Sequence, residues 1–356
     1  MTHHPQTQTA AQTHLTSPAA PTPTPTRRLG ATGPEVGALG LGCMGMSPAY
    51  GAAGDRAESI ATLHAALEAG VTLLDTGDFY GMGHNELLIG EALRTAPAAR
   101  REQALLSVKF GSMRGPDGAF SGQDGRPAAV KNFAAYSLQR LGVDHIDVYR
   151  ISRLDPQVPI EETVGAVAEL VEQGYVRHIG LSEVGAGTIR RAAATAPIAD
   201  LQFEYSLLSR SIEAEILPTV RELGIAVTAY GVLAHGLISD HFGPGRTLTP
   251  DDFRAHTPRF QGDNLRRNLD LAGALRAIAA DKGITLAQTA IAWALSRGAD
   301  IVPVIGARTR ERLTESLGAL DVTLDAADLA AIEAAIPEGA AAGDRYPTAM
   351  MADLER

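Results

Sequence analysis

Short apolar runs that alternate with helical patterns along residues 38–336 predict an α/β fold with a parallel sheet. Two further observations narrow this to a (β/α)8 barrel, the TIM-barrel architecture. The alternation repeats eight times with mostly short connections, and eight strands are the number that closes such a barrel. We therefore expect one barrel domain over residues 27–356, with long loops at the C-terminal ends of its strands.

Each predicted unit is an apolar run of strand length followed by residues with helical periodicity. The predicted strands span residues 38–45, 71–76, 104–110, 145–152, 177–182, 200–205, 225–230 and 301–305. The predicted helices span residues 58–69, 85–95, 128–141, 161–173, 186–194, 213–223, 265–281, 286–296, 308–317 and 326–336. The longest interruptions are residues 112–127, residues 232–264 and the stretch from Pro337, and we expect these loops to shape a binding pocket.

Residues 40–45, GLGCMG, match the GxGxxG spacing of nucleotide-binding open sheets. That fingerprint requires a helix beginning at its last glycine and an acidic residue about 20 positions later at a strand end. The loop-like sequence SPAYGAAGD follows instead, and no second strand carries such an acid. We interpret the match as accidental and the glycines as allowing a tight turn over the barrel mouth.

Composition excludes several other classes of protein. The net charge of −10 is spread without acidic or basic blocks, which argues against nucleic acid and anionic membrane surfaces as partners. No apolar run is long enough to span a membrane. The single cysteine, Cys43, fits a reducing compartment, so we expect a cytoplasmic protein. Residues 1–26 are rich in Thr, Pro, Gln and Ala and predict a disordered tail, and nothing in the sequence predicts the oligomeric state.

Polar side chains stand at the ends of predicted strands, where barrel enzymes carry their catalytic groups. Asp75 ends the second strand, Tyr80 follows it, and Lys109 lies within the third strand. Because Asp and Lys are almost never fully buried unless paired, we expect Asp75 and Lys109 to meet. The cation would lower the pKa of a nearby tyrosine, which suits a general acid. A structural salt bridge with an unrelated tyrosine is the alternative.

The motif DTGDFYG resembles the Asp-x-Ala-x-x-Tyr-Gly signature of the aldo-keto reductases, and VKFG resembles their catalytic-lysine strand. The resemblance continues in order through GYVRHIGLSEV, LQFEYSLLSR, AYGVLAHGLIS, VIGARTRERLTESLGAL and GDRYPTAMM, over roughly residues 27–350. The family implies a (β/α)8 barrel, NADPH bound without a Rossmann domain, and reduction of a small carbonyl substrate. Under this resemblance Tyr80 protonates the substrate oxygen, Lys109 lowers the pKa of Tyr80, and Asp75 holds Lys109.

The resemblance also implies cofactor contacts. Ser182 and Gln202 match positions that hydrogen-bond the nicotinamide carboxamide, and Tyr230 matches the aromatic that stacks on the nicotinamide. Glu183 stands where the family often has Asn, which puts one amide donor in doubt. The other implied contacts are Leu233, His235, Gly306, Arg308, Arg312, Glu315 and Ser316. Among these, two arginines at a helix N-terminus suit the 2′-phosphate of NADPH, which favours NADPH over NADH.

The segment DVYRISRLDP departs from the family pattern D-L-Y-x-x-H, because Ser152 stands at the histidine position. That imidazole donates a hydrogen bond to the substrate carbonyl, and serine is a shorter and weaker donor. Losing one such donor typically costs on the order of 10²–10³ in rate, so we expect carbonyl reduction to survive. Arg150 lies on the same strand face as Ser152 and is either a substrate contact or part of a buried ion pair. Met44, after the first strand, is another candidate substrate contact.

Two other functions remain open. A roomier site would let a conjugated carbonyl sink deeper, so that hydride reaches the β-carbon and the protein acts as an ene-reductase. The fold could instead bind NADPH as a sensor or regulatory module, as the potassium-channel β-subunits of this superfamily do. The presence of Asp75, Tyr80 and Lys109 argues against a purely binding role. No metal site is predicted, because His235 and His241 share a loop without a third ligand.

Overall fold

The computed structural model describes residues 24–243 and 245–355, so the predicted tail lies outside the described residues up to residue 23. Eight parallel strands close into a barrel, which confirms the predicted architecture. In chain order they are β3 (Gly40–Gly42), β4 (Leu73–Gly77), β5 (Leu105–Phe110), β8 (Ile146–Ile151), β9 (Val176–Ser182), β10 (Ile198–Glu204), β11 (Ala226–Tyr230) and β12 (Ile301–Gly306). Each corresponds to one of the predicted apolar runs.

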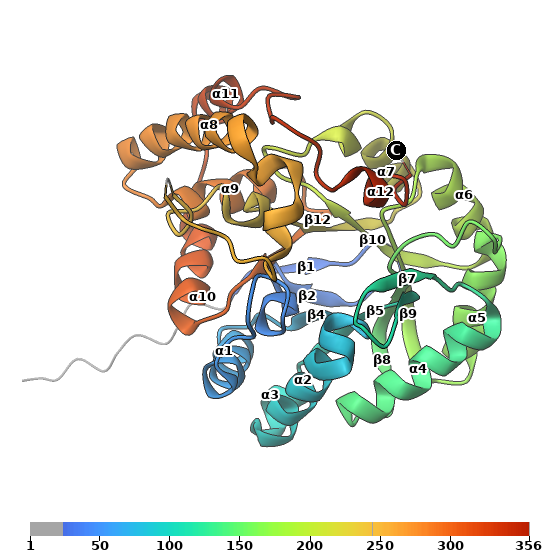
Figure 1. Ribbon diagram of the computed structural model, residues 1–356. Coiled ribbons are helices and arrows are strands. Elements are labelled where there is room, and N and C mark those ends of the chain that lie inside the picture. The colour runs from blue at the N-terminus through green and yellow to red at the C-terminus, as the bar shows by residue number, and fades with distance from the viewer. Residues whose placement is uncertain (1–23, 244, 356) are drawn as a thin grey trace, which may run out of the picture.

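Helices form a ring around the strands (Figure 1). Those that follow the predictions are α1 (Arg56–Glu68), α2 (His84–Thr95), α4 (Pro127–Leu141), α5 (Ile160–Glu172), α6 (Ala186–Thr195), α7 (Ile216–Glu222), α8 (Gly262–Asp281), α9 (Leu286–Ser296), α10 (Arg310–Leu317) and α11 (Ala326–Ala335). The short helices α3 (Ala98–Arg101) and α12 (Thr348–Met351) were not predicted. Within the described ranges, no helix combines the length and apolar character needed to cross a membrane.

The glycine-rich segment forms the first barrel strand, β3, which pairs with β4 and β12. A Cβ at Gly40 would lie 3.0 Å from a methyl of Leu73, and one at Gly42 would lie 3.3 Å from a methyl of Val304. Glycine therefore lets β3 lie close to its neighbours. The 3-10 helix η1 (Met44–Met46) follows, so the GxGxxG match does not open a nucleotide-binding helix.

A hairpin that the sequence did not predict covers the end of the barrel where the strands begin. Its strands are β1 (Thr26–Arg28) and β2 (Glu35–Gly37). Leu29 and Val36 are buried in one apolar cluster with Leu73 and Ala226, the first residues of β4 and β11. This packing closes the barrel floor and leaves the opposite end for ligands.

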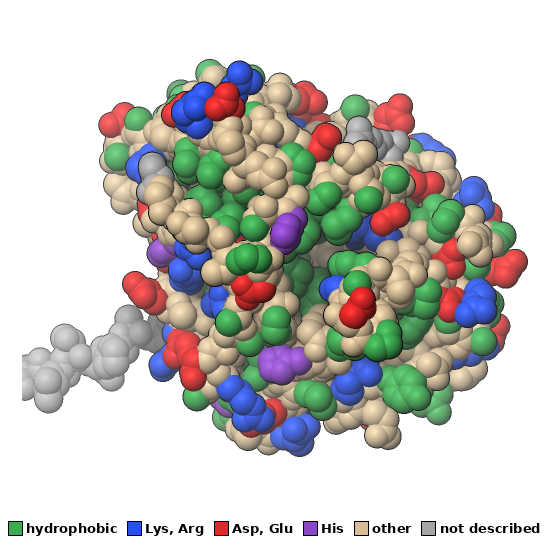
Figure 2. Space-filling view, in the orientation of Figure 1, with side chains coloured by type: hydrophobic (Ala, Val, Ile, Leu, Met, Phe, Trp, Pro, Cys, Tyr) green, Lys and Arg blue, Asp and Glu red, His purple; other side chains and the backbone are tan. Residues whose placement is uncertain are grey.

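Three long segments surround the C-terminal ends of the strands. Residues 112–127, expected to be a loop, form the hairpin β6 (Ser112–Arg114) and β7 (Phe120–Gln123). The second segment contains the 3-10 helices η4 (Ala234–Gly236), η5 (Phe253–His256) and η6 (Pro258–Phe260), and the third runs from Pro337 through α12. Figure 2 shows a hollow near the middle of the molecule in this view, with hydrophobic side chains around it.

Candidate active site

The predicted pair of Asp75 and Lys109 forms inside the barrel. Lys109 Nζ lies 2.6 Å from one carboxylate oxygen of Asp75, and Ser107 donates to the other at 2.8 Å. Both charged side chains are almost fully buried. Burial disfavours the charge on Asp75, but Lys109 and Arg150 outweigh it and hold the pKa of Asp75 below its ordinary value. Burial lowers the pKa of Lys109, and the carboxylate of Asp75 offsets this lowering only in part.

Arg150 is a structural residue, which corrects its assignment as a candidate substrate contact. Its fully buried guanidinium donates to both oxygens of Asp200, at 2.9 and 2.7 Å, and to Asp75 at 3.2 Å. A Cβ at Gly180 would come within 2.5 Å of an Asp200 oxygen and 2.8 Å of Arg150 Nε, so the glycine leaves room for the pair. The alternative prediction, a buried ion pair, is confirmed.

Tyr80 follows β4 in the 3-10 helix η2 (Tyr80–Gly83). Gly81, Met82 and Gly83 have positive φ values and turn the chain sharply after the tyrosine. Lys109 Nζ lies 5.1 Å from the centroid of the Tyr80 ring. The predicted direction of the tyrosine pKa is wrong, because burial and the Asp75 carboxylate raise the pKa of Tyr80 well above its ordinary value. The phenol is therefore protonated at neutral pH, as a proton donor must be.

Ser152 is buried directly after β8, and its hydroxyl is already engaged. Its Oγ hydrogen-bonds to Oγ of Ser112 on β6, and Ser112 donates at 2.9 Å to Oε1 of Gln123 on β7. A hydroxyl has one proton, so Ser112 accepts from Ser152. The Ser152 proton therefore points to the hairpin. This hydrogen bond was not predicted, because residues 112–127 were expected to form a loop.

Ser182 and Gln202, the predicted carboxamide contacts, are paired in the register of β9 and β10. Ser182 Oγ is buried and has no hydrogen-bond partner among the described residues. Gln202 Nε2 donates to Asp75 at 2.8 Å, which links this position to the pair of Asp75 and Lys109. A buried hydroxyl without a partner is unfavourable, so an incoming amide group would fit here.

Tyr230, the predicted stacking residue, is held through its hydroxyl at the end of β11. It donates to Glu183 at 2.7 Å and shares a hydrogen bond of 2.8 Å with the hydroxyl of Tyr346. Glu183 is fully buried and accepts from Arg345 at 2.7 Å. Glu183 accepts hydrogen bonds here, so it does not supply the amide donor that Asn would supply at this position. It connects Tyr230 to the C-terminal segment.

A second carboxylate, Glu204, lies beside Glu183 and is also fully buried. Arg259 and Arg345 each lie 3.4 Å from it. Burial opposes its charge, but Arg345, His235 and Arg259 outweigh the burial and lower the pKa of Glu204. We call Glu183, Glu204, Arg259 and Arg345 the rim cluster. None was predicted as a site residue, although an acid at the end of an apolar strand is a signal that would have found Glu204.

The imidazole of His235 lies between a tyrosine hydroxyl and a carboxylate. Its Nδ1 lies 2.9 Å from the hydroxyl of Tyr50, and its Nε2 lies 3.8 Å from Glu204. Its φ of 56° places it in the left-handed region inside η4. Leu233, the other predicted contact in this segment, is half-buried against the core.

Arg308 and Arg312 lie in a group of like charges that also contains Arg246 and Arg254. Burial lowers the pKa of Arg308, and repulsion from the other three lowers it further. Within the described ranges, only Arg254 has a carboxylate partner, Asp252 at 2.7 Å. The group carries surplus positive charge that an anionic ligand would neutralise. Arg246 and Arg254 were not predicted, because their loop lies far in sequence from Arg308 and Arg312.

The structure also places the four remaining predicted contact residues. Gly306 is exposed at the end of β12, with open space where a Cβ would lie. Glu315 pairs with His241 at 2.8 Å, and Ser316 is buried in α10. Met44 is half-buried in η1.

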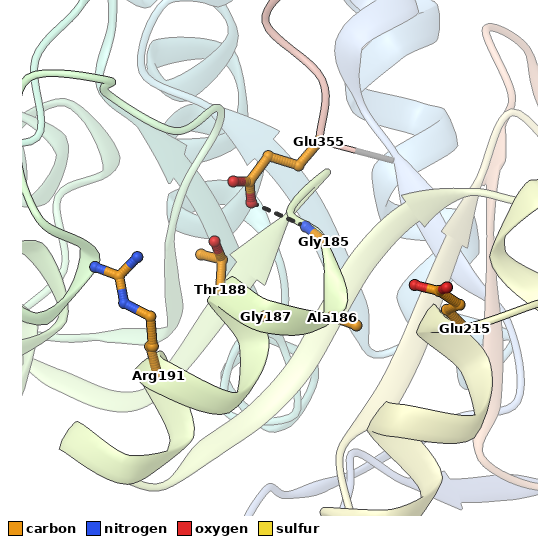
Figure 3. Close-up of a pocket in the computed structure, with 7 residues that line it drawn as sticks. All are labelled: Gly185, Ala186, Gly187, Thr188, Arg191, Glu215 and Glu355. Carbon is orange, nitrogen blue, oxygen red and sulfur yellow. Dashed lines mark hydrogen bonds between the residues drawn. The ribbon is translucent and has the colours of Figure 1, made fainter.

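Two surface cavities, of about 310 and 270 Å³, lie near α6 and the start of α5. None of the predicted catalytic or cofactor residues lines either of them. In the larger one the Glu355 carboxylate accepts a hydrogen bond of 3.0 Å from the amide of Gly185, just before α6 (Figure 3). This hydrogen bond holds the C-terminal segment against the connection between β9 and α6.

The model of the Aldo/keto reductase family matches residues 38–337. The chain belongs to the aldo/keto reductase family. A curated relative, "Probable aldo-keto reductase 1" from Glycine max, is 42% identical over 321 residues, which are 90% of this chain and 91% of that protein. The chain is therefore an oxidoreductase of a family that uses nicotinamide cofactors.

Two solved structures of the family are also similar. A glycerol dehydrogenase from Gluconobacter oxydans is 27% identical, with a TM-score of 0.79 over 87% of this chain and 94% of that chain. The holo form of an aldo-keto reductase from Bacillus halodurans is 27% identical, with a TM-score of 0.70 over 87% of this chain and 96% of that chain. Both likenesses agree with the barrel fold.

Proposed function

We propose that the protein reduces an aldehyde or ketone to an alcohol with NADPH, and that Tyr80 donates the proton. The main support is the protonated Tyr80, whose ring centroid lies 5.1 Å from Lys109 Nζ, while Lys109 Nζ lies 2.6 Å from a carboxylate oxygen of Asp75. The cofactor, when bound, supplies a hydride to the carbonyl carbon. Tyr80 gives its proton to the carbonyl oxygen, and Lys109 stabilises the phenolate that remains. Asp75 fixes the position of Lys109.

The proposal assigns the nicotinamide end of the cofactor to Ser182, Gln202 and Tyr230. The unpartnered Ser182 hydroxyl supports this, because an amide would satisfy it. Arg308 and Arg312 would bind the 2′-phosphate, since a dianion relieves the repulsion within their group. We therefore expect Arg308→Met to raise KM for NADPH and to leave KM for NADH almost unchanged.

An ene-reductase is the second candidate. The observation that favours it is the hydrogen bond between Ser152 and Ser112, which directs the Ser152 proton away from a substrate carbonyl. A conjugated carbonyl that is not held at this point can move deeper, so that hydride adds to its β-carbon.

NADPH consumption over a panel of aldehydes, ketones and enones, followed by product analysis, tests both candidates. The main proposal expects alcohols from aldehydes or ketones. A saturated ketone from cyclohexenone would favour the second candidate. Binding of NADPH without oxidation by any panel member would contradict both.

We also propose a cytoplasmic location. Cys43 is the one cysteine of the chain, and it is buried and unpaired in the structure. This is typical of proteins from reducing compartments.

A further inference from the structure

Arg153, directly after Ser152, has no carboxylate within ion-pair distance in the described part of the chain. Its one side-chain hydrogen bond there runs from Nη1 to the carbonyl oxygen of Ser152, at 2.6 Å. The side chain is half-buried. A half-buried guanidinium with most of its donors unused is a natural contact for an anion.

Arg153 lies beside a tyrosine of the C-terminal segment at the barrel mouth. The guanidinium carbon lies 6.0 Å from the centre of the Tyr346 ring. Its charge also acts on Tyr80 and Tyr230, where it opposes the rise in pKa that burial causes. Arg153 therefore lies at the barrel mouth beside Tyr346, whose hydroxyl hydrogen-bonds to that of the proposed stacking residue Tyr230.

The carboxylates of the rim cluster are bound by other groups and not by Arg153. The two carboxylates of the rim cluster are matched by its own two arginines, and Arg153 adds a third cation. Glu183 attracts Arg153, but its oxygens already accept from Arg345, Tyr230 and the amide of Glu204. Glu183 thus stabilises the charge of Arg153 only from beyond ion-pair distance, and no carboxylate of the described residues binds its guanidinium directly.

We propose that Arg153 binds a carboxylate of the substrate, so that the preferred substrates are aldehydes or ketones that carry a carboxylate. The proposal rests on the carbonyl reduction proposed above. A guanidinium fork binds a carboxylate through two parallel hydrogen bonds, which fixes the orientation of the ligand. Hydride adds to the carbonyl carbon and the Tyr80 proton to its oxygen, while the carboxylate is unchanged. This anchor orients the substrate where the Ser152 hydroxyl is engaged elsewhere.

The first test compares matched substrates. We expect kcat/KM to be roughly 10- to 100-fold higher for 4-carboxybenzaldehyde than for methyl 4-formylbenzoate, mainly through KM. The same direction is expected for succinic semialdehyde against butanal. In Arg153→Met the ratio falls to near one, and Arg153→Lys keeps part of it. The control Arg191→Met removes a surface arginine paired with Glu161 and leaves the ratio unchanged.

The second test needs no turnover. Benzoate should bind the NADPH complex of the wild-type protein in calorimetry, and Arg153→Met should lose that binding. If no aldehyde is reduced but this difference is found, carbonyl reduction fails and the anion site stands. Equal kcat/KM for acid and ester in the wild-type protein, or an undiminished ratio in Arg153→Met, would overturn the proposal.

Discussion

The molecule contains two buried groups of charges that are built in different ways. The interior group, Asp75, Lys109, Arg150 and Asp200, comes entirely from the strands β4, β5, β8 and β10. The rim cluster takes its carboxylates from the ends of β9 and β10, but its arginines from η6 and the C-terminal segment. The interior group is complete when the barrel closes, whereas the rim cluster also needs two long segments to dock.

We expect the two groups to have different roles in the proposed site. The interior group supports the proposed proton donor Tyr80 through Lys109. The rim cluster supports Tyr230 through Glu183. We expect damage to the interior group to act mainly on kcat, and damage to the rim cluster to act mainly on KM for the cofactor.

Lys109→Met is expected to have the largest effect. It removes the cation beside Tyr80 and breaks a buried ion pair, which typically costs about 3–5 kcal/mol of unfolding free energy. We expect kcat to fall by more than about 10²-fold. Denaturant unfolding and steady-state kinetics measure the two effects.

The matched control for this prediction is Lys131→Met. Lys131 pairs with Glu169 at 2.6 Å, but both side chains are largely exposed, so the loss should stay below about 1 kcal/mol. Equal losses in the two variants would contradict the role of the interior group.

Arg345→Met should have a smaller effect on stability. It leaves Glu183 without its guanidinium, while Glu204 keeps Arg259, so we expect a loss of about 1.5–3 kcal/mol. KM for NADPH should rise by a larger factor than kcat falls, because Tyr230 loses its support. The control Arg190→Met breaks an exposed pair with Glu222 and should change neither constant. A fall in kcat at constant KM would contradict the division of roles.

Asp78, which lies outside both groups, should respond to pH in the opposite direction to Glu204 of the rim cluster. Burial and the neighbouring Glu86 raise the pKa of Asp78, which directly follows β4, to about 8. The folded protein keeps a proton that the unfolded chain releases near pH 3.9, so this contribution to stability is complete below about pH 4 and is lost as the pH rises toward 8. The pKa of Glu204 is lowered instead, so its contribution is present above the ordinary pKa of Glu and is lost only in acid.

Urea unfolding between pH 5 and pH 8 measures this difference. The unfolding free energy should fall by at most about 1.4 kcal/mol per pH unit in the wild-type protein. Asp78→Asn should remove most of this slope. A slope that persists in the variant would show that another group causes it.

The sequence predicted the interior group better than the rim cluster, for a physical reason. Asp75 and Lys109 are charges in apolar runs on consecutive strands, and neighbouring strands bring such residues together. The partners of Glu183 and Glu204 lie in segments without strand or helix periodicity, so only the folded chain reveals Arg259 and Arg345.

Three features were predicted wrongly or missed: the direction of the Tyr80 pKa, the β6–β7 hairpin and the β1–β2 hairpin. The direction of the tyrosine pKa depends on how deeply Tyr80 is buried and on its distance from Asp75, which no pattern of residues gives. The hairpin that engages Ser152 consists of two short strands of mostly polar residues joined by a turn with two glycines, Gly115 and Gly118, and we therefore predicted a loop. The β1–β2 hairpin was missed because strands of three residues are too short to show alternation.

Tyr80→Phe tests the central claim most directly, because it removes one hydroxyl and keeps the ring beside Lys109. The measurement combines kcat for an accepted aldehyde with the Kd for NADPH from fluorescence quenching. We predict that kcat falls by about 10²–10⁴-fold while the Kd for NADPH stays nearly unchanged. A variant that reduces the aldehyde at close to the wild-type rate would contradict the claim that Tyr80 donates the proton.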